Sequence, residues 1–359
     1  MNTKSFFEYL GIADMERVHS QILAWIFSSD CDSIDSKQKN ELFQKLFNIN
    51  NDSQIVNVLT EYNNIDILIE TNNDVVVIEN KIKSSQHSNQ LVRYKTLCDI
   101  KFRNKAKHYF FLTLIGEQSN DLDWNIITYI QIYQKIKSLE LVADTKNTVI
   151  LNEYLFFLER LNNVTQDFIK FPLNYDIVFT DGNKRKADKI NIEYRNDQEK
   201  FIASNQLETI LQKYFLNSLI LKVTNSIGNV GDTRGVALVD FIIREGINYN
   251  GKCYSTMIQL QGNTIKFAFV IGENKYAKSN KKWIVDIIPL MKMLSKKNEF
   301  GYKKPNIPTA KAYVSISKKI DGHYWHIDIE DLADLIMIEI ENGKYLTDEL
   351  IKAINLINN

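Results

Sequence analysis

Three consecutive runs rich in valine and isoleucine constrain the fold of this chain more than any other feature. The runs cover residues 54–62, 65–71 and 74–80, and the pairs Asn63-Asn64 and Asn72-Asn73 lie between them. Short runs of this composition bounded by turn residues are typical of strands. Asparagine tolerates the positive φ angles that two-residue hairpin turns require. We therefore predict a three-stranded meander.

Before and after the meander, the spacing of the apolar residues is that of a helix. Residues 15–27 repeat apolar side chains every three to four positions. The remaining expected elements of the first 165 residues are helices at 36–48, 85–100, 130–139 and 148–163, and strands at 108–115 and 125–129. This order predicts an α/β domain with a mixed central sheet flanked by helices.

A polar stretch at residues 180–199 indicates a boundary in the second half of the chain. We therefore expect a domain at 1–165, a connecting segment at 166–199 and an α+β domain at 200–359. In the α+β domain the pattern predicts helices at 200–226, 283–296, 330–341 and 346–358, and strands at 234–244, 252–261, 264–272, 311–318 and 323–329.

Composition and charge exclude several classes of protein. Hydrophobic residues make up 44% of the 359 residues, which is too many for a disordered chain. The 44 basic residues balance the 44 acidic ones, so the chain is no general polycation. Cys31, Cys98 and Cys253 lie far apart and predict no disulfide framework. No apolar run is long enough for a membrane span and no signal peptide is visible, so we expect a cytoplasmic protein without membrane contact.

Three charged residues interrupt the apolar strands of the meander: Asp66, Glu79 and Lys81. Glu79 and Lys81 are two residues apart, so on a strand they share a face. If Asn72-Asn73 is a two-residue turn, the register places Asp66 directly opposite Glu79. Residues opposite each other on one face have Cβ atoms about 4.5–5.5 Å apart.

Two carboxylates at this distance repel each other unless a cation lies between them. Oxygen ligands of this kind suit Mg²⁺, which binds through one or two carboxylates together with water and phosphate oxygens. Lys81 would then project beside the metal, where it could orient a water molecule or stabilise charge on a phosphate.

The same residues also have an ordinary structural explanation. A Glu-x-Lys pair on an exposed strand is usually solvated, and Glu16 could simply be a favourable charge in the first turn of a helix. Neighbouring residues favour the chemical interpretation. Gln90 and Tyr94 share a face of the next helix, and Glu16 precedes the polar residues His19 and Ser20 by one turn.

Taken together, these blocks resemble the PD-(D/E)XK nuclease superfamily, the fold of many restriction endonucleases. The resemblance covers residues 16–165 and includes the αβββαβ order. It is carried by residues 16–25, 65–70, 78–81 and 90–94, and by Tyr129 and residues 152–155. The proline that precedes the aspartate in the name of the superfamily is Ile65 here, a departure that is frequent in the superfamily.

The resemblance implies a role for each of these residues. Asp66 and Glu79 would bind the metal, with the backbone carbonyl of Asn80 as a third ligand. Lys81 would be the catalytic lysine. Supporting roles fall to Glu16, which would assist the metal site from the first helix, and to Gln90 and Tyr94, which would orient the site or touch the substrate backbone. The implied cofactor is Mg²⁺, which Mn²⁺ could replace.

The second half of the chain carries a local concentration of lysine. Residues 275–319 hold twelve lysines against two acidic residues, with aromatic residues between them. A lysine surface of this kind could follow a phosphate backbone, and Lys281 and Lys282 are its candidate substrate-binding residues. The alternative is an ordinary solvated surface of a lysine-rich chain. The segment His323-Tyr324-Trp325-His326 has no completing metal ligands at known spacing, so we expect packing there.

We therefore expect a Mg²⁺-dependent nuclease that hydrolyses DNA, in a setting of bacterial restriction or anti-phage defence. Two alternatives remain open at this point. The chain could be a catalytically silent member of the fold that binds nucleic acid or serves in assembly. It could also be a nuclease gated by a ligand-sensing C-terminal domain. The sequence also leaves open a homodimer or a complex with a partner protein.

Overall fold

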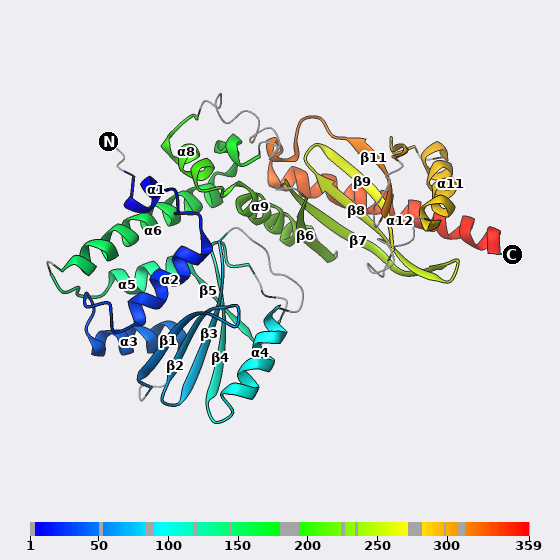
Figure 1. Cartoon of the computed structure of the whole chain (residues 1–359). Coiled ribbons are helices and arrows are strands. Elements are labelled where there is room, and N and C mark those ends of the chain that lie inside the picture. Colours follow the sequence, from blue (N-terminus) through cyan, green and yellow to red (C-terminus); the bar gives the residue numbers. More distant parts are fainter. Residues whose placement is uncertain are drawn as a thin grey trace. The chain divides into compact units, whose positions relative to one another are not determined.

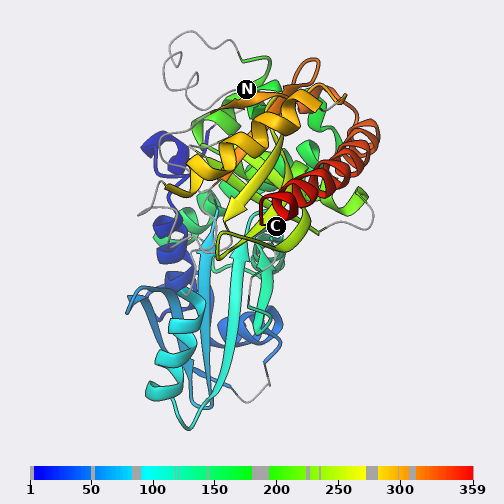
Figure 2. The same ribbon diagram turned by 90° about the vertical axis from the view of Figure 1, so that its right-hand side faces the viewer.

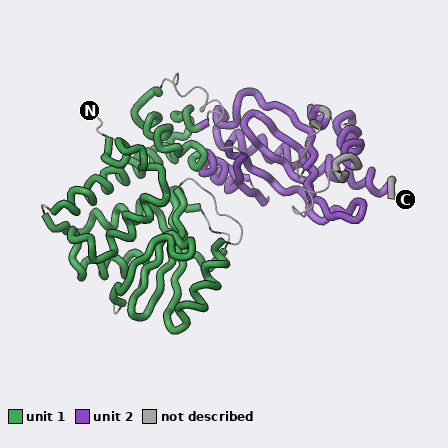
Figure 3. The backbone as a smooth tube through the Cα atoms, in the orientation of Figure 1, with its two compact units in different colours: residues 1–178, 193–211 green, residues 179–192, 212–359 purple. Residues whose placement is uncertain are grey.

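The computed structural model of the chain forms two compact units (Figure 3). Unit 1 consists of residues 1–178 and 193–211, and unit 2 consists of residues 179–192 and 212–359. Within these units the structure describes residues 4–49, 53–82, 90–117, 119, 121–143, 145–179, 194–223, 227–233, 236–271, 282–297, 299–306 and 313–358. Across these ranges no helix has both the length and the apolar character needed to cross a membrane.

Unit 1 is built on a five-stranded mixed sheet with the order β1-β2-β3-β4-β5 (Figure 1). The predicted meander is confirmed: β1 pairs antiparallel with β2, and β2 with β3. β4 and β5 extend the sheet in parallel to β3. The strands are β1 (Ile55–Tyr62), β2 (Ile65–Thr71), β3 (Asp74–Lys81), β4 (Ala106–Thr113) and β5 (Trp124–Thr128).

Helices cover both faces of this sheet, because β3 and β4 are buried on both sides. Helix α4 (Gln90–Lys101) packs on the face formed by alternate residues such as Leu68, Val77 and Phe111. The opposite face includes Ile78 and Leu112 and lies against the apolar sides of three helices. These helices are α2 (Glu16–Phe27), α3 (Ser36–Phe47) and α5 (Tyr129–Lys137).

Three further helices complete the described part of unit 1: α1 (Phe6–Leu10), α6 (Lys146–Lys170) and α8 (Asp197–Ser204). Ser5 caps α1 by accepting a hydrogen bond from the backbone of Glu8. The first residue of α1 donates its backbone N–H to Glu153 of α6 at 2.8 Å. The ring of Phe157 on α6 lies 5.9 Å from that of Phe201 on α8, so α8 belongs to the core of this unit.

Unit 2 contains an antiparallel sheet of six strands with the order β10-β11-β9-β8-β7-β6. The strands are β6 (Ile227–Thr233), β7 (Val236–Tyr249), β8 (Lys252–Gln261), β9 (Thr264–Ile271), β10 (Lys303–Asn306) and β11 (Tyr313–Lys319). Helix α9 (Glu208–Lys222) leads into this sheet. Helix α11 (Lys282–Lys297) contacts β10 and β11, and α12 (Ile329–Asn358) contacts β7 and β8 (Figure 2).

Several sequence predictions for the second half are wrong. The strand expected at 323–329 is a 3-10 turn at Tyr324–His326 followed by the start of α12. Its alternating pattern arises from aromatic packing, since the rings of His323 and Trp325 stack with centroids 4.0 Å apart. The helix expected at 200–226 is two helices, α8 and α9, and β6 and β10 were not expected. In the first half of the chain, α1 was not expected.

The two C-terminal helices expected at 330–341 and 346–358 are one helix, α12. Gly343 lies between the two predicted segments and weakens the helical pattern. A Cβ atom at this position would lie 3.1 Å from the side chain of Ile258 on β8. The glycine therefore permits close packing of the helix on the sheet rather than ending the helix.

Candidate active site at the end of the β2–β3 hairpin

The register of the β2–β3 hairpin agrees with the one predicted from its Asn-Asn turn. Glu70 pairs with Val75, and Ile67 pairs with Ile78. One further step in the same register brings Asp66 opposite Glu79. Because side chains alternate along a strand, Asp66, Glu79 and Lys81 all lie on the face that α4 covers. Asn80 therefore lies on the face covered by α2.

The Glu79 carboxylate is buried completely, with no exposed surface. Its Oε1 atom lies 2.6 Å from Nζ of Lys81 and accepts a hydrogen bond of 2.8 Å from Nε2 of Gln90. Its Oε2 atom has no hydrogen-bond partner among the residues that the structure describes. A buried carboxylate oxygen without a partner is costly and needs a compensating group.

Helix α4 holds Glu79 through a short chain of hydrogen bonds. Gln90 donates to the hydroxyl of Tyr94 at 2.7 Å as well as to Glu79, as their spacing on the helix predicts. The hydroxyl of Tyr94 in turn donates to the backbone carbonyl of Asn64, in the β1–β2 turn. This chain therefore fixes Glu79 between a helix and a hairpin turn.

The pKa values of the three charged groups reflect their shared burial. Burial, followed by the charge of Asp66, raises the pKa of Glu79 to about 7 against the opposing effect of Lys81. Burial is also the largest cause of the raised pKa of Asp66. For Lys81, burial acts to lower the pKa, but the surrounding carboxylates, with Glu79 first, raise it overall.

Glu16 joins the end of β3 to the first turn of α2. Its Oε1 atom accepts a hydrogen bond of 2.8 Å from the backbone N–H of Ile82, the residue after Lys81. Its backbone carbonyl accepts a hydrogen bond of 2.9 Å from Nδ2 of Asn80. The backbone N–H of Asn80 donates to Oδ2 of Asp66 at 2.7 Å. Residues on both sides of Lys81 are thus anchored to α2.

The side chain of Asn80 is engaged on the opposite face of the sheet. Its Nδ2 atom also lies 3.1 Å from Oγ of Ser20, and its Oδ1 atom accepts a hydrogen bond of 2.6 Å from the hydroxyl of Tyr129. The amide therefore anchors α2 and α5 to β3. A metal on the α4 face could use the backbone carbonyl of Asn80 but not its side chain.

His19 of α2 is buried, and its ring lies 5.5 Å from that of Tyr129. Its Nε2 atom is 2.9 Å from the backbone carbonyl of Ala13 and therefore carries the proton. Nδ1 then accepts a hydrogen bond of 3.1 Å from the hydroxyl of Tyr154. Burial lowers the pKa of His19 to about 4, so the imidazole is neutral at pH 7. The sequence alone did not indicate that His19 and Tyr154 form this pair.

The donor atoms on the α4 face fit a hard divalent cation. Within the described ranges, no group of three or more histidine, cysteine or acidic residues is arranged to hold a metal. Mg²⁺ does not need such a group, because one or two carboxylates with water and phosphate oxygens suffice. The unpartnered Oε2 of Glu79 beside Asp66 meets this requirement.

The described residues of the lysine-rich region belong to unit 2, whereas the β2–β3 site belongs to unit 1. Lys281 lies outside the described residues, and Lys282 is the first residue of α11 in unit 2. Lys318 forms an ion pair of 2.6 Å with the buried Glu339 of α12. This lysine therefore stabilises unit 2.

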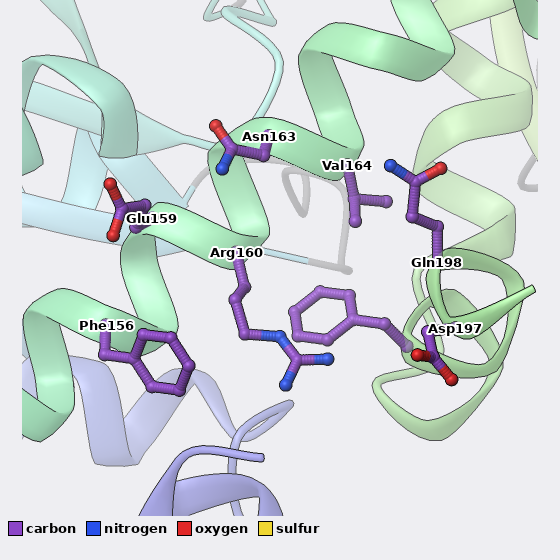
Figure 4. Close-up of a pocket in the computed structure, with 8 residues that line it drawn as sticks. Phe156, Glu159, Arg160, Asn163, Val164, Asp197 and Gln198 are labelled. Atoms are coloured by element: carbon purple, nitrogen blue, oxygen red, sulfur yellow. The ribbon is translucent and has the colours of Figure 1, made fainter. Parts of the chain in front are cut away.

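A surface pocket of unit 1 lies between α6 and α8, outside the β2–β3 site. Figure 4 shows the lining residues Glu159 and Arg160 on α6 and Asp197 and Gln198 on α8, with the Glu159 carboxylate directed away from α8. Its charged side chains already have partners, since Arg160 pairs with Glu8 at 3.3 Å and Glu159 with Lys137 at 2.9 Å. We therefore interpret this pocket as packing between helices.

This mixed sheet, with two carboxylates and a lysine at the end of a hairpin, is consistent with the PD-(D/E)XK fold. Residues 4–170 match the family model described as the PD-(D/E)XK nuclease superfamily. This part of the chain is therefore similar to that superfamily, whose members are generally nucleases. No curated protein and no solved structure matches the chain.

Proposed function

We propose that the chain is a Mg²⁺-dependent nuclease that hydrolyses phosphodiester bonds of DNA. The observation that carries this proposal is the buried Glu79, whose Oε2 atom lies beside Asp66 without a hydrogen-bond donor among the described residues, while Lys81 contacts its other oxygen. The match of residues 4–170 to a nuclease superfamily supports the same chemistry.

In this proposal Asp66, Glu79 and the carbonyl of Asn80 would hold the metal. When bound, the metal would polarise the phosphate and lower the pKa of a water molecule. Lys81 would donate to a non-bridging phosphate oxygen or orient the attacking water. Gln90 keeps Glu79 in position, and Tyr94 keeps Gln90 in position. Glu16 would hold the end of β3 in place through Ile82.

We further propose that residues 1–165 form the nuclease domain, that 166–199 connect it, and that 200–359 bind substrate or a partner. The family resemblance favours a cytoplasmic protein of restriction or anti-phage defence. In such a setting the second domain would determine when or where the nuclease acts.

The proposal is tested by incubating the purified full chain with plasmid, linear duplex, single-stranded DNA and RNA. Each reaction is run with Mg²⁺, with Mn²⁺ and with EDTA. We expect cleavage of DNA with either metal and none with EDTA. Cleavage that persists in EDTA, or no cleavage of any substrate, would contradict the proposal.

The hydrogen bond from Tyr129 to the side chain of Asn80 can be tested by mutation. Tyr129→Phe removes the hydrogen bond to Oδ1 of Asn80 and leaves that buried atom unpaired. We expect a loss of about 10- to 100-fold in cleavage rate, as for other groups that orient a metal site without touching the metal. Tyr133→Phe is the matched control, because Tyr133 lies on the same helix and donates to Glu159 instead. Equal rates for the two variants would contradict a positioning role for Tyr129.

A further inference from the structure

A basic side chain lies at the rim of the candidate active site. Arg17 follows Glu16 in the first turn of α2, and the Glu16 carboxylate contacts the backbone directly after Lys81. The side chain of Arg17 is 74% exposed, and its Nε atom lies 4.0 Å from Oε1 of Glu61. An exposed ion pair at this distance contributes little to folding stability. The pair is therefore free to exchange partners.

The position of Glu61 links this pair to the proposed metal ligands. Glu61 lies on β1 between Thr60, which pairs with Ile67, and Tyr62, which pairs with Ile65. It is therefore opposite Asp66 in the register.

Helix α2 is held against this part of β1 by a second contact. Gln21 lies one turn after Arg17 and donates to Oγ1 of Thr60 at 2.8 Å. Helix α2, which carries Arg17, is therefore held to the sheet by the contacts of both Glu16 and Gln21. A phosphodiester that reaches Asp66 and Glu79 would bring its neighbouring phosphates to the same rim.

We propose that Arg17 binds a backbone phosphate of the substrate next to the scissile phosphate, and that Glu61 holds Arg17 when no substrate is present. Guanidinium groups bind phosphate oxygens through two parallel hydrogen bonds, which favours this exchange over the distant carboxylate. The inference rests on the proposed nuclease function and assigns a residue outside the Asp/Glu/Lys group to substrate binding.

Steady-state cleavage of a duplex oligonucleotide by the full chain, measured at several salt concentrations, tests this assignment. We expect Arg17→Ala to raise KM about tenfold, the cost of one charged hydrogen-bonded contact, with kcat almost unchanged. The slope of log KM against log salt should fall by about 0.9, the share of one phosphate contact. Arg103→Ala is the matched control, because Arg103 is exposed and lies beyond the opposite end of the sheet, before β4.

Glu61→Gln gives an independent measurement. It should lower KM when Arg17 is present, because it releases the arginine, and leave KM unchanged in the Arg17→Ala background. Both are measured at saturating Mg²⁺, because the loss of the Glu61 charge also acts on the nearby Asp66. An unchanged KM and salt slope for Arg17→Ala overturns the inference while cleavage by the wild type leaves the proposed function intact. A fall in kcat at constant KM also overturns it. Failure of the wild type to cleave or bind any nucleic acid rejects the proposed function itself.

Discussion

Replacing Lys81 with alanine is expected to lower the rate of Mg²⁺-dependent DNA cleavage by about 10³-fold, a typical cost of losing one preorganised donor at a reacting centre. Lys81 lies 2.6 Å from Glu79 and is largely shielded from solvent. If it only neutralised Glu79, its loss would weaken metal binding, and excess Mg²⁺ would restore the rate. We expect no such recovery, because the lysine would act on the phosphate or the attacking water. The cleavage rate is therefore measured at saturating Mg²⁺.

Lys105→Ala is the matched control for this variant. Lys105 also forms an ion pair with a carboxylate of the same sheet, at 2.8 Å from Oε1 of Glu70. It contacts the carbonyl of Thr71, at the other end of β2 from Asp66. Its replacement should leave the cleavage rate almost unchanged, because Lys105 contacts the end of β2 that is far from Asp66. Equal losses in the two variants would indicate a general effect on the sheet rather than a catalytic role for Lys81.

The fold of unit 1 could be predicted because its signals are local. The Asn-Asn turns fix the hairpin register, and that register alone brings Asp66 opposite Glu79. Side-chain alternation then decides which face each residue occupies. Gln90 and Tyr94 could be placed together from their spacing on one helix, and their hydrogen bond is present.

Contacts between elements distant in the sequence could not be predicted in this way. The side chain of Asn80 lies in the middle of the predicted motif, yet its partners Ser20 and Tyr129 come from helices before and after the meander. No periodic pattern in the sequence predicts that these three side chains contact one another. In unit 2 the glycine in α12 and the aromatic turn before this helix led to wrong predictions of a helix break and of a strand. Both features reflect tertiary packing rather than local propensity.

The three hypotheses drawn from the sequence can now be ranked by the site itself. A catalytically silent member of the fold would have no reason to keep a fully buried carboxylate oxygen unsatisfied, since replacing it with an amide would remove the desolvation cost. This argument favours the active enzyme. A nuclease gated by its second domain is compatible with the same site, and it predicts cleavage only after a ligand or partner is added.

Acidification is expected to destabilise unit 1 through His19. Burial holds the pKa of His19 at about 4 in the folded chain, against about 6.5 in an unfolded chain. The unfolded state therefore takes up a proton below pH 6.5 that the folded state does not, and the free energy of unfolding falls as the pH decreases. Between pH 7 and pH 4.5 the loss should reach about 2 kcal/mol for this residue alone.

His19→Gln is the variant that isolates this effect, because glutamine can still donate to Ala13 and accept from Tyr154 without titrating. Urea-dependent hydrogen exchange of peptides from α2 and α6 measures the unfolding of unit 1 within the full chain. The difference in unfolding free energy between pH 7 and pH 4.5 should be smaller in His19→Gln by about 2 kcal/mol. The His19 imidazole of the wild type, whose nitrogens are followed by NMR, should stay neutral as the pH falls to about 4. An identical pH dependence in both proteins, or a His19 that titrates near pH 6.5, would show that the imidazole is not held neutral beneath the site.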